Sequence, residues 1–519
     1  MKKTFRQLIQ EKEFIITWEL VPGRGSWEDT HRNVLKLADQ AAIGKKVHAV
    51  SLTENPGGKT GIQPEVIGRE IAELGMESII HITCKDKNRS QLESHLYALE
   101  RLKLNNLLVI SGDYATESIL GCPKPVFDID STHLLKLITE MNSGIEFSTP
   151  RGKTRIKPSN FFPGAAVSPF KATEAEQMLQ YSKLKKKIEN GAQYIITQIG
   201  YDARKYHELL LYVNTMKWKV PLIGNIFMVD YPAARIMNKN NIPGCVVTDK
   251  LLAQLEQENQ SCDKGIAVRM ERAAKLFAVL KGMGYQGVHL GGLNVTYEQI
   301  EYVISRGEEL LPNWKEYVSE FDYPQDQGFY IFEKNNETGL NQEKMSDSPE
   351  NAQKKTDINY KISRGFHKLF FVPGKKFFPV MQKLSSRLEG RKLEKYFHGI
   401  ERISKEFMYN CQDCGDCALT DVAYVCPMGD CPKNQRNGPC EGSYYGWCEV
   451  YPGKRQCVWV KAYQRLKNYH EEKQLNSYPV SPYNWKLQHT SSWINYYTGK
   501  DHSAERLGIQ RGNTKEQSK

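Results

Sequence analysis

The chain has 519 residues, more than one ordinary domain accommodates, so we expect two or three domains. Its 40% hydrophobic and 25% charged residues exclude disordered, collagen-like and membrane-embedded proteins. No stretch approaches about 18 consecutive apolar residues, and the basic N-terminus lacks the apolar segment of a signal peptide, so we expect a cytoplasmic protein with no membrane-spanning segment.

The net charge of +11 and the cysteines are unevenly distributed. Residues 361–519 hold 26 Lys and Arg against 15 Asp and Glu, whereas residues 1–360 hold 45 of each. Eight of the twelve cysteines lie between residues 411 and 457. Without a secretion signal the chain is expected in a reducing compartment, where such clusters hold metal rather than disulfides. Two units of different chemistry are therefore expected.

The first 310 residues alternate short β-branched runs with stretches that have apolar residues at helical spacing. The predicted strands span residues 14–21, 47–53, 78–84, 105–111, 162–167, 194–199, 221–227 and 287–292. The predicted helices include residues 30–43, 90–102, 175–190 and 268–283. Eight strands alternating with helices in about 300 residues predict a closed (β/α)8 TIM barrel, in preference to an open doubly wound sheet.

A polar segment follows the barrel. Residues 335–360 are rich in Asn, Gln, Ser, Lys and Glu and contain few apolar side chains, which predicts a flexible linker. We therefore expect a barrel domain over residues 1–320, a linker over residues 335–360 and a cysteine-rich, metal-binding domain over residues 361–519.

The C-terminal unit begins with a basic, aromatic stretch. Residues 361–410 contain 12 basic and 4 acidic side chains. This stretch could form helices that pack on the cysteine module with their lysines extended into solvent. It could also bind an acidic partner protein, or an anionic membrane surface, because Phe370, Phe371, Phe377 and Phe378 alternate with lysines.

In a TIM barrel the catalytic groups lie at the carboxyl ends of the strands. Polar side chains occupy six of the eight predicted ends, and they are Glu19, Thr53, Asn55, His81, Thr83, Asp113, Gln198 and Asn225. Two carboxylates, a histidine and several amides above an enclosed floor are typical of a site for a polar, heteroaromatic small molecule.

The cysteine module has the spacing of a metal site. Its cysteines are Cys411, Cys414, Cys417, Cys426, Cys431, Cys440, Cys448 and Cys457. The C-x2-C-x2-C opening and the two Cys-Pro pairs resemble bacterial ferredoxin sequences, so iron-sulfur clusters of the [4Fe-4S] type are favoured over structural zinc. Eight thiolates could hold two four-iron clusters, or one cluster and one zinc.

The aromatic residues of the C-terminal segment are expected to cover the metal module and to pack it on the barrel. Aromatic and basic residues around cysteines can also bind single-stranded nucleic acid. The positive charge lies mostly before the cysteines, so we expect no nucleic-acid partner.

Six segments with recognisable residues are spread in order along residues 10–310, and they are WEL with Glu19, VSLTENP, HITCKDKNR, NNLLVISGD with Asp113, KLKKKIENGAQYIITQ with Gln198, and HLGGLN. Across this range the chain resembles methylenetetrahydrofolate reductases. Residues 364–508, with the cysteine run and the ending TSSWINYYTGKDHSAERL, resemble the cysteine-rich C-terminal domain of acetogen-type methylenetetrahydrofolate reductases.

The resemblance implies a flavin on the barrel, FAD or FMN, that reduces 5,10-methylenetetrahydrofolate to 5-methyltetrahydrofolate. It implies that Glu19 is the general acid, with a raised pKa, and that Asp113 and Gln198 contact the folate. It implies that the flavin contacts Thr53, His81, Ser111, Gly112, Asp113, Lys186 and Lys187. Ser111 stands where the family often has Arg, and the loop after the fifth strand lacks an expected tyrosine.

A cluster beside a flavin would convert one-electron input into two-electron reduction. The electron donor is then expected to be an acidic protein such as ferredoxin, bound by the basic stretch. Alternatively, NAD(P)H reduces the flavin directly and the C-terminal domain is a structural zinc domain, or the chain is a non-catalytic folate-binding adaptor. We also expect a homo-oligomer.

Overall fold

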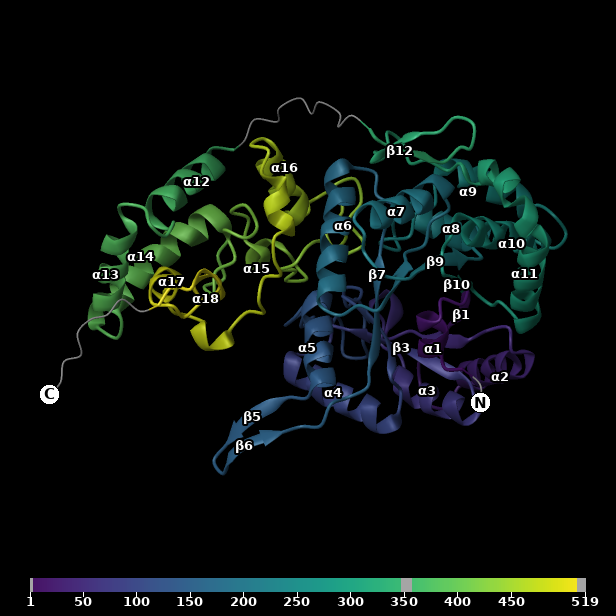
Figure 1. Cartoon of the computed structure of the whole chain (residues 1–519), viewed down its shortest axis with the longest axis horizontal. Helices are drawn as coiled ribbons and strands as arrows, with labels where there is room; N and C mark the ends of the chain where they lie inside the picture. The colour runs from purple at the N-terminus through teal and green to yellow at the C-terminus, as the bar shows by residue number, and fades with distance from the viewer. Residues whose placement is uncertain (1–2, 347–356, 511–519) are drawn as a thin grey trace.

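The computed structural model describes residues 3–346 and 357–510. Eight parallel strands close into a barrel in the order β1-β10-β9-β8-β7-β4-β3-β2 (Figure 1). The barrel strands are β1 (Ile15–Leu20), β2 (Ala49–Leu52), β3 (Glu77–Thr83), β4 (Asn106–Ile110), β7 (Phe162–Val167), β8 (Tyr194–Thr197), β9 (Leu222–Phe227) and β10 (Gly287–Gly291). The predicted (β/α)8 barrel is therefore confirmed. Seven of its strands lie within the predicted runs, and β3 begins one residue before its run.

Helices cover the outside of the barrel and pack their apolar faces on the strands. They are α2 (Asp29–Gly44), α3 (Pro64–Glu73), α4 (Arg89–Leu102), α5 (Ser131–Ser143), α6 (Glu174–Glu189), α7 (Ala203–Thr215), α8 (Tyr231–Asn238), α9 (Asp249–Glu258), α10 (Ile266–Met283) and α11 (Tyr297–Leu310). Side chains cap the N-termini of α4, α5, α6, α7, α8 and α11 and satisfy free backbone N–H groups there; Asp130, for example, accepts hydrogen bonds from the first turn of α5.

Helix α1 (Phe5–Gln10) closes the amino-terminal end of the barrel. The ring of Phe5 packs edge-on against Phe162 and Tyr194, with centroids 6.0 and 5.4 Å apart. These rings belong to an apolar cluster that fills the barrel interior. The open end of the barrel is therefore the carboxyl end of its strands, where TIM barrels carry their sites.

Shorter elements decorate the barrel. They are η1 (Pro56–Gly58), the hairpin β5 (Glu146–Thr149) and β6 (Gly152–Arg155), η2 (Leu311–Phe321), and the antiparallel pair β11 (Phe332–Lys334) and β12 (Asn341–Met345). Strand β12 falls inside the predicted linker. The side chain of Asn341 accepts a hydrogen bond from Nε of Arg204 on α7 and donates one to the backbone carbonyl of Arg204. Residues 347–356 of that linker lie outside the described residues.

The cysteine-rich region is mainly helical. Its elements are α12 (Ile358–Phe370), α13 (Phe378–Leu388), α14 (Lys392–Tyr409), α15 (Pro427–Asp430), α16 (Val458–Lys467), η3 (Glu472–Asn476), η4 (Trp485–Leu487), α17 (Ser492–Tyr497) and α18 (His502–Leu507). Figure 1 shows α16 beside α6 and shows α12, α13 and α14 at the end of the molecule away from the barrel.

Helix α6 lies between the barrel and the C-terminal domain. Its Leu179 joins a buried cluster with Trp459 and Tyr463 of α16. Lys183, Lys186 and Lys187 of the same helix are at most 2% exposed. From the sequence alone, the simplest interpretation of KLKKK is a helix face whose lysines extend into solvent. These three lysines are instead buried, because the C-terminal domain covers this side of α6.

Within the described residues, no helix is both long enough and apolar enough to cross a membrane.

Candidate active site

A cavity of about 230 Å³ opens at the carboxyl ends of the barrel strands. Seven residues singled out from the sequence line it, and they are Glu19, Thr53, His81, Ser111, Gly112, Asp113 and Gln198. Thr83 and Asn225, also expected at strand ends, line the same cavity. Asn55 does not; its amide instead bonds Gly61 and Asp86 in the loop after β2. Parallel strands end on one side, so residues far apart in sequence meet here.

Glu19 has a histidine neighbour that the sequence did not single out. Its Oε2 lies 3.7 Å from Nε2 of His289 on β10, and His289 Nδ1 is 2.7 Å from Oγ1 of Thr17. Burial opposes ionisation of Glu19, but His289 and His81 outweigh burial and lower its pKa. The raised pKa expected for this carboxyl is thus wrong, because strand β10 contributes an imidazole to the site.

His81 is held in its neutral form. Burial lowers its pKa to about 4, although the carboxylate of Glu19 favours the protonated ring. Its Nε2 is 2.7 Å from Oγ of Ser51 on the neighbouring strand. At neutral pH, His81 therefore offers the cavity an uncharged imidazole.

The loop after β4 brings Gly112 and Asp113 to the rim. Gly112 has φ +88°, and a Cβ atom there would lie 2.9 Å from Cβ of Thr83. Glycine is therefore required, and its neighbour Asp113 accepts a hydrogen bond of 2.7 Å from the N–H of Gly57 through Oδ2. This contact fixes the second carboxylate of the site.

Three buried polar atoms of the cavity wall have no hydrogen-bond partner among the residues that the structure describes. They are Thr53 Oγ1, Thr83 Oγ1 and Asn225 Oδ1. Buried polar groups are normally satisfied, so unpartnered hydroxyl and amide oxygens around a cavity indicate a ligand that hydrogen-bonds to them. An isoalloxazine or pterin ring carries both donors and acceptors along its edge and fits this lining.

The C-terminal domain forms part of the cavity wall. Lys433, Cys440, Glu441, Gly442 and Glu449 line it beside the strand ends. The ammonium group of Lys433 donates a 2.7 Å hydrogen bond to the carbonyl of Gly112 and pairs with Glu449. No motif of the sequence placed these residues at the barrel, since their position depends on how the two domains pack.

Lys186 and Lys187 do not line the cavity and contact other groups instead. Lys187 donates to Glu441 Oε1 at 2.5 Å and to the carbonyl of Ala166 at 2.6 Å. The ammonium of Lys186 lies 5.6 Å from the centre of the Trp459 ring, and burial lowers its pKa to about 8. Both lysines contact the C-terminal domain, and their assignment to flavin phosphates stays a prediction.

The eight clustered cysteines divide into two quartets. Quartet I, Cys411, Cys414, Cys417 and Cys426, lines one small cavity. Quartet II, Cys431, Cys440, Cys448 and Cys457, lines a second one. Cys440 also lines the barrel cavity, so quartet II shares a wall with the candidate active site.

Several sulfur atoms accept hydrogen bonds from nearby groups. The N–H of Asp413 donates to Cys411 at 3.4 Å, and the N–H of Gly429 donates to Cys426 at 3.3 Å. The ammonium of Lys405 lies 3.5 Å from Cys417. Such donors stabilise thiolates, the form that binds metal. Among the described residues, no three His, Cys, Asp or Glu side chains are grouped as ligands of a single metal ion.

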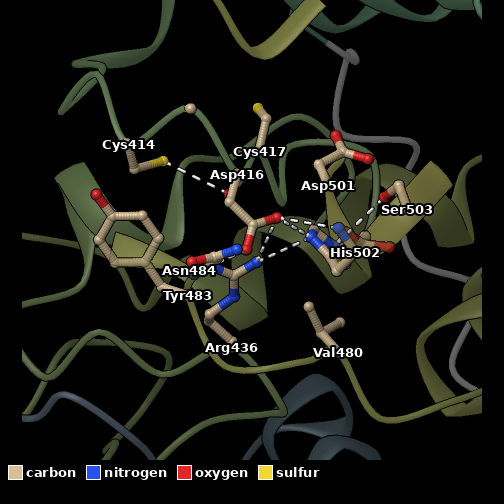
Figure 2. Close-up of polar contacts among 12 residues, drawn as sticks. Cys414, Asp416, Cys417, Arg436, Val480, Tyr483, Asn484, Asp501, His502 and Ser503 are labelled. Atoms are coloured by element: carbon tan, nitrogen blue, oxygen red, sulfur yellow. Dashed lines mark hydrogen bonds and ion pairs between the residues drawn. The ribbon is translucent and has the colours of Figure 1, made fainter. Parts of the chain in front are cut away.

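A buried charged network lies beside quartet I (Figure 2). His502 contacts the carboxylate of Asp416 through Nδ1 and that of Asp421 through Nε2, the latter at 2.9 Å. Arg436 Nη2 lies 3.9 Å from Asp416. Burial alone would lower the pKa of His502, but the two carboxylates outweigh it and raise the pKa to about 9. Figure 2 shows Asp416, Arg436 and His502 of this network beside Cys414 and Cys417.

Two family models match this chain, one over the barrel and one over the C-terminal domain. The family model described as methylenetetrahydrofolate reductase matches residues 4–306, more than half of the chain. This chain belongs to the methylenetetrahydrofolate reductase family. The model described as the methylene-tetrahydrofolate reductase C terminal matches residues 391–486, which include both cysteine quartets. Both parts of the resemblance noted in the sequence are confirmed, and the family supports a folate-metabolising oxidoreductase.

A solved structure similar to this chain is that of an uncharacterised protein from Clostridium thermocellum that binds two copies of 5-methyl-5,6,7,8-tetrahydrofolic acid. It is 14% identical, with a TM-score of 0.41, and the match covers 59% of this chain and 99% of that one.

Proposed function

We propose that this chain reduces 5,10-methylenetetrahydrofolate to 5-methyltetrahydrofolate with a flavin bound at the barrel mouth. The observation that carries the proposal is the cavity in which Glu19, His289, Asp113 and Gln198 meet beside unpartnered polar atoms. A flavin bound there would supply the hydride for the folate methylene carbon. The residues of the chain then have to hold the folate and protonate it.

Protonation is the task of Glu19. Opening the five-membered ring of the folate requires a proton on the departing nitrogen. Because His289 favours the ionised form of Glu19, the proton has to reach Glu19 from a neighbour. His289 lies within 3.7 Å and can carry it. Asp113 and Gln198 orient the pterin ring through their carboxylate and amide.

The substitution Glu19→Gln tests the activity. It keeps the shape of the side chain and removes its proton transfer, so folate reduction should fall by about 100-fold or more. Rapid mixing of the pre-reduced protein with methylenetetrahydrofolate, followed through flavin absorbance without oxygen, measures this step. Flavin content and folate affinity should be largely retained. Unchanged turnover would exclude Glu19 as the acid, and binding without turnover by the unmodified protein would favour a folate-binding adaptor.

The two cysteine quartets are proposed to hold iron-sulfur clusters. Four cysteines around each small cavity and donors aimed at the sulfur atoms support this assignment, as does the C-x2-C-x2-C spacing. Clusters would supply one-electron carriers beside the flavin. Cys440 belongs to quartet II and also lines the barrel cavity. Quartet II is therefore the quartet next to the candidate active site.

Metal and flavin content separate this proposal from the zinc alternative. Protein purified without oxygen should contain about eight iron atoms and eight acid-labile sulfides, the content of two four-iron clusters. Acid-released flavin identified by chromatography decides between FAD and FMN. Stoichiometric zinc without iron would instead support a structural domain, with NAD(P)H reducing the flavin directly.

A further inference from the structure

Helices α12, α13 and α14 expose an unusual number of large apolar side chains. Twelve of them within residues 358–407 are between 39% and 93% exposed, and these are Ile358, Ile362, Phe366, Leu369, Phe377, Val380, Leu384, Leu393, Tyr396, Ile400, Ile403 and Phe407. The three helices form the end of the molecule opposite the barrel (Figure 1). Exposed apolar side chains in this number are typical of an interface.

The exposed residues follow the helical period. On α14 the apolar positions 393, 396, 400, 403 and 407 are spaced by three and four residues and so form one stripe. The opposite side of α14 packs on the domain, where Glu401 and Lys405 are buried and bond Ser492. On α12 the buried positions are Tyr360 and Ser363, again opposite the exposed ones. The apolar stripes therefore face away from the protein.

The same three helices and their connections carry an excess of positive charge. Ten exposed basic side chains lie on the three helices and their connections, namely Lys361, Lys368, Lys375, Lys376, Lys383, Arg387, Arg391, Lys392, Lys395 and Arg402. Of the four acidic residues between 361 and 410, Glu401 is buried, Glu389 and Glu394 are partly buried, and Glu406 is exposed. The surface thus combines exposed apolar stripes with a strong excess of positive charge.

We propose that α12, α13 and α14 bind the surface of an anionic lipid membrane. Amphipathic helices with large apolar residues on one side and Lys or Arg beside them lie in the headgroup region of such membranes. A second copy of this chain is disfavoured, because pairing would bring two strongly basic surfaces together. A soluble acidic electron carrier would use a small, polar contact that leaves most of the apolar side chains uncovered. The proposal is independent of the reaction at the barrel.

Vesicle flotation with the purified full-length protein tests the proposal. The protein should float with vesicles of equal parts phosphatidylglycerol and phosphatidylcholine, and float at least about tenfold less with phosphatidylcholine alone or at high salt. The double variant Ile400→Asp/Ile403→Asp should lose flotation to the same degree. Both positions are about 70% exposed (69% and 71%), so folding should be retained. The variant Lys375→Glu/Lys376→Glu, in the exposed connection between α12 and α13, should weaken flotation without removing apolar surface.

A matched control is Ile43→Asp/Val66→Asp, which changes two exposed apolar residues on the barrel helices α2 and α3 (71% and 47% exposed). It should float like the unmodified protein. The proposal is overturned if the protein does not float with anionic vesicles, or if it floats equally well with anionic and neutral vesicles. It is also overturned if flotation is unchanged in both Ile400→Asp/Ile403→Asp and Lys375→Glu/Lys376→Glu. Absent flotation together with a dimer abolished by Ile400→Asp/Ile403→Asp would assign the surface to a second copy. Absent flotation together with salt-sensitive binding of ferredoxin would assign it to an acidic protein.

Discussion

Lys187 of the barrel and Glu441 of the C-terminal domain form a buried ion pair, with Nζ and Oε1 2.5 Å apart and side chains 2% and 12% exposed. Burial opposes the charge on Glu441, but Lys187 and Lys183 outweigh it and lower the pKa of the carboxyl to about 2. Lys183 in turn donates to Gln435 at 2.8 Å. The lysines of α6 therefore bind the two domains together.

Removing one member of this pair should destabilise the protein strongly. Glu441→Gln leaves the ammonium of Lys187 buried without its countercharge, which should cost about 3 kcal/mol. Lys187→Met should lower the free energy of unfolding by a similar amount, because it leaves the carboxylate of Glu441 buried without its countercharge. The double variant should lose less than the sum of the two, because it leaves neither charge unpaired. Chemical denaturation of all four proteins measures the coupling; additive losses would show that the pair is not energetically coupled.

His502 should make stability dependent on pH. Its pKa is about 9 in the folded protein and about 6.5 in the unfolded chain. A raised folded pKa means that the stabilisation is fully present below pH 6.5 and is lost as pH rises through 9. The thermal midpoint of the unmodified protein should therefore exceed that of His502→Gln by an amount that shrinks between pH 6.5 and 10. His470→Gln, an exposed histidine of the same domain, is the control; a constant difference would contradict the prediction.

His289 should control the titration of Glu19. Removing the imidazole in His289→Gln should raise the pKa of Glu19, since His289 lowers it in the native site. The loss of folate reduction at high pH should then shift upward, and the maximal rate should fall by about tenfold or more because the proton donor is missing. The pH dependence of flavin oxidation by methylenetetrahydrofolate measures both. An unshifted profile would show that His289 does not act on Glu19.

Each cysteine quartet should lose its metal independently. Cys414→Ser changes quartet I and Cys440→Ser changes quartet II. Each variant should retain about half of the iron of the unmodified protein, because each four-iron cluster needs its own four thiolates. Cys262→Ser changes an exposed cysteine of the barrel domain and should leave the iron content intact. Loss of all iron in both variants would indicate one shared centre.

The barrel was predictable because its signals are local. β-branched runs and helical spacing placed all eight strands, and strand direction then brought Glu19, His81 and Asp113 to one end. His289 was missed although its strand was recognised. Within GVHLGG the histidine lies before the predicted strand end, and only the closure of the barrel between β1 and β10 brings it beside Glu19.

The sequence by itself determined the barrel, its open end, the polar residues at the strand ends and the cysteine-rich second unit. Tertiary structure decided that α6 is buried, that Lys433 and Cys440 reach the barrel mouth, and that the cysteines form two quartets. Helical and strand periods act over a few residues and are visible in the sequence. The contact between Lys187 and Glu441 joins residues 254 positions apart, and no local pattern specifies which distant surfaces pack together.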